Sequence, residues 1–418
     1  MDRLLAVPLA ELEPEQCATA LHRQSPTVVA PPPVDAEPAV RPYRSPNGQA
    51  SRTSKALAGS LVGSAFRALL ATAFGIVPRL THDVVVSGLE HFSGHRPTII
   101  ICNHKRDLDT VVLMSVMFFA RRDIRRGGPF SIGLADKFFQ PGFLGRYWRW
   151  PLLGQVMGRV DLRPVLRLLN AYPIGPVTSR ARLPMVYGQL RQFVDLVESG
   201  HDVYWSPEGT LSANGSLSPL RAGLYRIVRE SRLSPHLLPI HINYDFMTNG
   251  RPRCFVRIGR ELPVNTRLRR TEFNRLAREA IVGQMTVNAA HLLAAVLRRQ
   301  GLEAPFSRSQ LETTLRQQLR EYHRQGWHID PRLTTSWTFH RRVTQLLAYA
   351  SKREILVETP HGWTLGRGFD DPELRYVLNE ISEIDPVLAP ALERRQNMPV
   401  VPRPLRPDDS PPTTPPAC

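Results

Sequence analysis

Short apolar runs alternate with longer amphipathic segments between residues 84 and 258, and this alternation constrains the fold more than any other feature. The strand-like runs are Val84–Val86, Thr98–Cys102, Ser131–Ala135, Asp202–Trp205, Leu237–Ile242 and Cys254–Ile258. The helical segments between them are Val111–Phe119, Leu183–Glu198 and Leu220–Glu230. In the second of these helices, Leu190, Val194 and Val197 share one side, and Gly200 follows as a stop signal. We therefore predict an α/β fold with a central, mostly parallel sheet flanked by helices.

Helical patterns replace this alternation from about residue 271. Apolar periodicity runs through Leu276–Arg299, Ser309–Arg324 and Ser336–Ser351. Two short runs, Ile355–Val357 and Trp363–Leu365, then flank a Thr-Pro-His-Gly turn and predict a hairpin. We expect a helical C-terminal extension, and helices followed by a hairpin also resemble a winged-helix module.

The segment Ala56–Val77 is apolar and about long enough to span a bilayer. However, Arg67 lies near its centre, where membrane insertion would cost roughly 2.5 kcal/mol or more. Ser60, Ser64 and Thr72 make it more polar still. We therefore expect an amphipathic helix that lies in the membrane interface or packs on the domain, rather than a spanning helix.

Composition and pattern together divide the 418 residues into five parts. We predict a disordered Pro-rich leader over 1–50 and a disordered Pro-rich tail over 397–418, because both hold too few apolar residues to offset their chain entropy. Between them we predict a membrane-associated helical segment over 51–80, the α/β domain over 81–270 and the helical C-terminal domain over 271–396.

The chain is strongly basic, with 54 Lys and Arg against 37 Asp and Glu and a formal net charge of +17. Such an excess favours an anionic membrane surface, phosphate-bearing substrates or nucleic acid. Nucleic acid is the least expected of these, because the sequence has no long basic tail. Four widely spaced cysteines, Cys17, Cys102, Cys254 and Cys418, have no metal-ligand spacing and indicate a reducing, cytoplasmic-facing protein without disulfides.

A histidine directly follows the buried strand-like run that ends at Cys102. The sequence there is Asn-His-Lys-Arg-Asp-Leu-Asp, from Asn103 to Asp109. The carboxyl end of a strand is where α/β proteins place reactive groups. A carboxylate from Asp107 or Asp109 can hold one nitrogen of the His104 ring, so that the other nitrogen can take a proton.

A polar turn, Ser206-Pro207-Glu208-Gly209-Thr210, follows the strand-like run that ends at Trp205. Its backbone N–H groups and hydroxyls are suited to an anionic or oxygen-rich ligand.

The order of these pieces resembles the glycerolipid acyltransferase family, which acylates glycerol-3-phosphate and lysophosphatidate. The motif His-x4-Asp at His104 and Asp109 is followed about a hundred residues later by Pro-Glu-Gly-Thr and then by the strand with Leu238-Pro239-Ile240. The resemblance covers roughly residues 84–263. Features typical of the glycerol-3-phosphate branch are Ser212, Asn214-Gly215, Leu220–Leu224, Tyr244-Asp245 and Leu374-Arg375-Tyr376 with Asn379.

The resemblance implies roles for individual residues. His104 would be the general base that deprotonates the acceptor hydroxyl, and Asp109, rather than Asp107, would orient its ring. Glu208, Gly209 and Thr210 would shape the acceptor site. The thioester donor would be acyl-CoA or acyl carrier protein, no covalent enzyme intermediate is needed, and neither a metal nor another cofactor is implied.

Two departures from the family pattern concern the cations that bind the acceptor phosphate. After Glu-Gly-Thr the family usually has arginine, and this chain has Leu211. The middle motif should end in arginine after an aromatic-Ile pair, but Tyr172-Pro173-Ile174 runs into Gly175-Pro176. The candidate replacements are Lys105, Arg106, Arg180 and Arg221.

The sequence therefore predicts an O-acyltransferase of phospholipid biosynthesis, peripheral or monotopic on the cytoplasmic side of a membrane, with a glycerolipid acceptor. The alternative is a catalytically inactive lipid- or nucleic-acid-binding protein on an acyltransferase-like fold, which the missing arginines favour. The intact His104, Asp109, Glu208 and Gly209 argue against that alternative.

Overall fold

The computed structural model describes residues 78–92, 97–120, 130–140, 161–175, 182–212, 214–300 and 305–385, together with a few isolated positions. The predicted leader, the predicted tail and almost all of Ala56–Val77 lie outside the described residues. Within the described part of the chain, no helix has the length and apolar character needed to cross a membrane.

An eight-stranded sheet organises the part of the chain before residue 264. Its order is β1-β7-β6-β2-β5-β3-β4, and β8 pairs with β6. The strands are β1 (Asp83–Ser87), β2 (Thr98–Cys102), β3 (Phe130–Ala135), β4 (Ala171–Ile174), β5 (Asp202–Trp205), β6 (His236–Asp245), β7 (Arg253–Ile258) and β8 (Leu262–Pro263). Strands β2 to β6 run parallel to one another, whereas β7 and β8 pair with β6 in the antiparallel sense.

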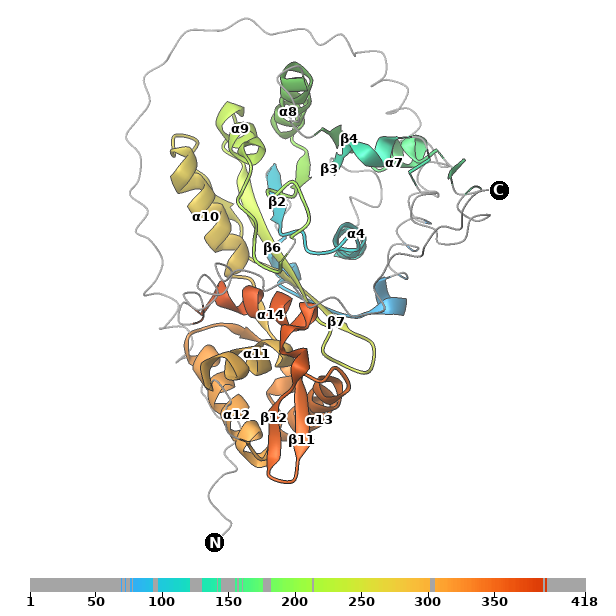
Figure 1. Cartoon of the computed structure of the whole chain (residues 1–418). Coiled ribbons are helices and arrows are strands. Elements are labelled where there is room, and N and C mark those ends of the chain that lie inside the picture. The colour runs from blue at the N-terminus through green and yellow to red at the C-terminus, as the bar shows by residue number, and fades with distance from the viewer. Residues whose placement is uncertain are drawn as a thin grey trace, which may run out of the picture.

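Helices cover both faces of this sheet (Figure 1). One face packs on α4 (Asp109–Ala120) and α7 (Arg163–Leu168), and the other on α8 (Leu183–Glu198), α9 (Ala222–Glu230) and α10 (Arg270–Val282). Strand β2 is buried at every residue because Ile99 and Ile101 face the α8 side while Ile100 and Cys102 face the α4 side. This two-sided burial explains its unbroken apolar run. The predicted fold class is confirmed.

The C-terminal part gathers at one end of the sheet (Figure 1). It contains β9 (Thr286–Val287), α11 (Ala289–Gln300), α12 (Arg308–Arg324), β10 (His328–Ile329), α13 (Ser336–Lys352), β11 (Leu356–Thr359), β12 (Gly362–Leu365) and α14 (Pro372–Ser382). Short 3-10 turns lie at Leu89–His91, Asp136–Phe139, Pro331–Leu333 and Arg367–Asp370. Strands β11 and β12 form the predicted antiparallel hairpin.

The apolar run Leu276–Arg299 is divided between two helices. Helix α10 ends at Val282, and α11 begins only at Ala289. Between them, β9 pairs with β10, and the side-chain amide of Asn243 bonds both backbone groups of Thr286. Helix α10 contacts β6 and α9, whereas α11 contacts α12, α13 and α14. The predicted domain boundary at residue 271 stays a prediction.

Candidate active site

His104 and Asp109 lie at the carboxyl end of β2, at the point where the chain turns into α4. His104 Nδ1 lies 3.3 Å from Asp109 Oδ2. The histidine side chain is 21% exposed, whereas the Asp109 side chain is completely buried. Since Nδ1 faces the carboxylate, Nε2 is the nitrogen left to act on a substrate. The structure thus brings together the two residues predicted as a catalytic pair.

Both carboxylate oxygens of Asp109 accept hydrogen bonds. Its Oδ2 also accepts hydrogen bonds from the backbone N–H groups of Lys105, at 2.5 Å, and Arg106, at 2.8 Å. Its Oδ1 accepts a hydrogen bond from the Tyr244 hydroxyl at the end of β6. Burial, together with the nearby Asp109 charge, raises the pKa of Tyr244, so the phenol stays protonated and remains a donor. A carboxylate with these donors and a place in the first turn of α4 stays in one orientation.

Asn103 fixes the start of the loop that carries His104. Its side-chain amide donates to the carbonyl of Ile242 at 2.8 Å and accepts from the N–H of the same residue at 2.7 Å. These two bonds continue the pairing of β2 with β6 by one residue beyond the end of β2. His104 therefore projects from a backbone that is anchored on the sheet.

Glu208 supports the same loop from β5. Its two carboxylate oxygens accept hydrogen bonds from the backbone N–H groups of His104, at 2.8 Å, and Ser218, at 2.7 Å. Ser212 donates its N–H to the His104 carbonyl at 2.6 Å. The side chain of Glu208 is buried, and burial raises its pKa although these bonds oppose the rise. The geometry makes Glu208 a support for His104 rather than a group that faces a ligand.

Two of the four cations predicted to replace the phosphate-binding arginines are exposed beside the site. Arg106 stacks on the ring of Phe246, with its guanidinium carbon 4.2 Å from the ring centroid. Arg221 lies against Gly209, and its Nε donates to the Glu208 carbonyl at 3.0 Å. Gly209 has a φ of 67°, which favours glycine, and a Cβ there would lie 3.0 Å from the Arg221 side chain.

The other two predicted cations differ. Lys105 is buried, with its ammonium group paired to Glu380 of α14, so it does not face solvent as a phosphate ligand would. Arg180 lies outside the described residues. Thr210 and Leu211 are exposed in the turn after β5.

The described cysteines are not placed as nucleophiles. Cys102 and Cys254 are completely buried, and burial raises the pKa of both thiols well above the usual range. Thiols in this state are not thiolates at neutral pH and do not attack a carbonyl. The site therefore favours direct transfer to an acceptor over a cysteine-bound intermediate.

A cavity of about 310 Å³ lies where the first residue of β1, the last residue of β6 and the first residue of β7 meet α13. Its lining includes Asp245, Arg253 and Arg342, and none of the residues predicted for the catalytic or acceptor site. Arg342 binds Asp245, at 2.6 Å, and Arg253 binds Asp330, which ties the C-terminal helices to the sheet. Ion pairs therefore join the sheet and the C-terminal helices around this cavity.

Sequence reasoning did not assign Tyr244, Asn103 or Glu380 to the site. Tyr244 was noted only as a family feature, although its place at the end of β6, the neighbour of β2, was a usable signal. Glu380 had no such signal, because it lies 275 residues from Lys105 in the sequence.

Comparison with known proteins agrees with this geometry. Residues 83–243 match the model of the family described as Acyltransferase. No curated protein matches the chain. Among solved structures, a 1-acyl-sn-glycerophosphate (LPA) acyltransferase, PlsC, from Thermotoga maritima is 16% identical, with a TM-score of 0.34 over 56% of this chain and 80% of that one. That score is too low to add to the family match.

A histidine held by a buried aspartate, within a segment that matches this family, defines an enzyme of the acyltransferase class. The match covers residues 83–243, which run from β1 into β6 and include both His104 and Asp109.

Proposed function

We propose that this protein transfers a fatty acyl group from the thioester of acyl-CoA or acyl carrier protein to a hydroxyl of glycerol-3-phosphate or a lysophospholipid. The observation that carries the proposal is the pairing of His104 Nδ1 with the fully buried Asp109. This pairing fixes the ring so that Nε2 meets the acceptor hydroxyl.

In the proposed reaction, His104 Nε2 takes the proton of the acceptor hydroxyl while the oxygen attacks the thioester carbonyl carbon. This attack forms the C–O bond of the new ester. The C–S bond then breaks, and the imidazolium gives its proton to the departing thiolate. Asp109 stabilises the imidazolium that exists between the two proton transfers.

The proposed acceptor carries a phosphate. Of the four predicted phosphate-binding cations, Arg106 and Arg221 are exposed and are proposed to bind it. Arginine suits this role because its planar guanidinium donates two parallel hydrogen bonds to phosphate. The excess of basic residues also supports binding of the protein to the anionic, cytoplasmic surface of a membrane. Apart from the missing arginines, no observation favours the alternative of an inactive lipid- or nucleic-acid-binding protein.

The test is transfer of radiolabelled palmitate from palmitoyl-CoA or palmitoyl acyl carrier protein to glycerol-3-phosphate, lysophosphatidate and phosphate-free hydroxyl lipids. We expect His104→Ala to lower kcat by at least about 100-fold, because general base catalysis contributes that much. His361→Ala, in the exposed hairpin turn, is the control and should match the wild type.

The same assay tests the acceptor. Arg106→Gln should raise KM for phosphorylated acceptors about ten-fold and leave phosphate-free acceptors unaffected. Full activity of His104→Ala, or no transfer by the wild type to any acceptor, contradicts the proposal.

A further inference from the structure

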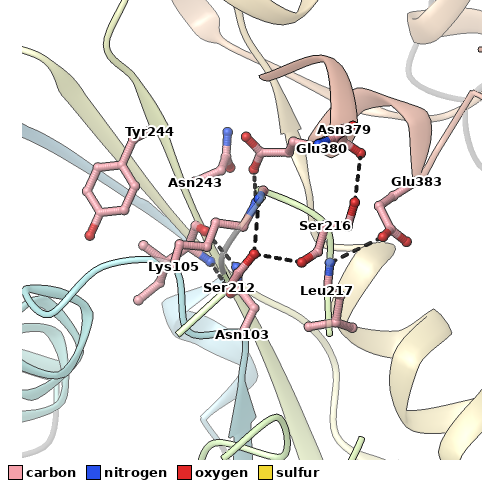
Figure 2. A network of polar contacts seen from close by, with 12 residues as sticks. Asn103, Lys105, Ser212, Ser216, Leu217, Asn243, Tyr244, Asn379, Glu380 and Glu383 are labelled. Carbon is pink, nitrogen blue, oxygen red and sulfur yellow. Dashed lines mark hydrogen bonds and ion pairs between the residues drawn. The ribbon is translucent and has the colours of Figure 1, made fainter. Parts of the chain in front are cut away.

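Lys105, the neighbour of His104, is held by the C-terminal part of the chain. Its side chain is 3% exposed and pairs with Glu380, which is 1% exposed (Figure 2). Burial alone would raise the pKa of Glu380, but Lys105, then His291 and His241, lower it to about 2. The carboxylate is therefore charged at neutral pH. A buried ion of either sign without its partner is strongly unfavourable, so each of the two fixes the other.

The other oxygen of Glu380 is also engaged, because its Oε2 lies 3.1 Å from Nε2 of His291 in α11. His241 of β6 is the third titratable group that acts on this carboxylate, and burial lowers the pKa of that histidine to about 3. Glu380 of α14 is thus held by His291 of α11 as well as by Lys105, and it is an anchor for Lys105.

Lys105 links that anchor to the catalytic pair. Its side chain points to Glu380, while its backbone N–H donates to Asp109 Oδ2, the oxygen that faces His104. The pairing with Glu380 thus restrains the residue whose backbone amide orients Asp109. Displacements of about 1 Å in a reacting group lower rates by up to about 100-fold.

Helix α14 also contacts the second half of the site. Asn379 donates to the Asn214 carbonyl at 2.9 Å, and Glu383 accepts from the Leu217 N–H at 3.2 Å. Ser216 lies between them and donates to the Asn379 carbonyl (Figure 2). One helix of the C-terminal part therefore contacts both loops that form the site.

From these contacts we propose that Glu380 is a positioning residue for acyl transfer, which acts through Lys105 on Asp109 and His104. The catalytic domain is then incomplete without α14. This inference rests on the proposed role of His104 as general base.

The test compares Glu380→Gln with Asp385→Asn in the full chain. Asp385 follows α14, accepts hydrogen bonds from Tyr322 and Arg299, and does not touch the site, so its variant controls for loss of stability alone. We expect Glu380→Gln to lower kcat on the order of 10- to 100-fold with both KM values within about two-fold. Asp385→Asn should keep kcat within about two-fold at a similar loss of Tm.

A double-mutant cycle then separates positioning from general support. If Glu380 acts through Asp109, the effect of Glu380→Gln on kcat should disappear in an Asp109→Asn background, whereas independent effects would add. If Glu380→Gln does not fold, the pair Lys105→Met and Glu380→Met, which leaves neither charge buried, is assayed in its place.

Equal kcat values for Glu380→Gln and Asp385→Asn at matched Tm, or additive effects in the cycle, would overturn the positioning role while leaving the proposed function intact. Failure of the proposed function is recognised separately, by an inactive wild type or an active His104→Ala. In either of those cases the positioning role fails with it.

Discussion

At the scale of single residues, the proposed catalytic pair of His104 and Asp109 depends on groups that only orient it. Asp109 accepts two backbone N–H groups, the Tyr244 hydroxyl and the His104 ring, and none of the first three reacts. A hydrogen bond to a charged group contributes about 1.5–3 kcal/mol, so the loss of one donor has a measurable effect on a group that must stay in place.

We expect Tyr244→Phe to lower kcat about ten-fold, which corresponds to about 1.4 kcal/mol in the activation free energy. The substitution removes the hydroxyl that holds Asp109 Oδ1 and leaves the ring in its place. The control is Tyr322→Phe, which removes an equivalent hydroxyl donor to buried Asp385 at 2.7 Å, outside the site. Steady-state kinetics checks both variants, and equal kcat values for the two would contradict a role for Tyr244.

At the scale of elements, the turn after β5 fits closely against α14. Gly215 has a φ of 93°, and a Cβ at this residue would lie 2.2 Å from the Tyr376 carbonyl oxygen. A side chain is therefore disfavoured both by the backbone conformation and by the contact with α14.

We expect Gly215→Ala to lower the free energy of unfolding by about 1–3 kcal/mol and to reduce kcat, because the turn must move away from α14. Gly188→Ala is the matched control. Gly188 lies inside α8, and a Cβ there meets no atom within 4 Å, so alanine should stabilise the helix by about 0.5–1 kcal/mol. Denaturant unfolding measures both, and a Gly215→Ala protein as stable as the wild type would contradict the close packing.

At the scale of the whole molecule, buried histidines make stability depend on pH. Burial lowers the pKa of His241 to about 3 and that of His328 to about 4. An unfolded histidine has a pKa of about 6.5, so the unfolded chain binds protons that the folded chain does not bind below that pH. The folded state therefore loses stability as the pH falls from about 6.5 towards 4.

We expect each of these histidines to lower the free energy of unfolding by up to about 1.4 kcal/mol per pH unit below about pH 6. Urea unfolding at pH 7.5, 6 and 5 measures the slope. His328→Gln should weaken the dependence of the free energy of unfolding on pH. His361→Gln, at an exposed residue, should leave that dependence unchanged. A stability that is independent of pH over this range would contradict the prediction.

The sequence by itself determined the order of most of the longer strands and helices, because periodicity and burial are local properties of a segment. It did not predict β4, α7 or the short strands β8, β9 and β10. The helix Leu183–Glu198 and the strand Asp202–Trp205 have the predicted bounds. It also indicated His104 with a carboxylate from Asp107 or Asp109, and the family resemblance selected Asp109, which lies 3.3 Å from the ring. The break between α10 and α11 was not predicted, because apolar periodicity is the same in the two helices on either side of β9.

Only the tertiary structure decided which charges are available to a substrate. Lys105 and Arg106 are neighbours with similar sequence surroundings, yet Lys105 is buried against Glu380 while Arg106 is exposed over Phe246. The physical reason is that the free energy of a charge depends on its partner and its exposure, and the partner of Lys105 comes from a helix 275 residues away.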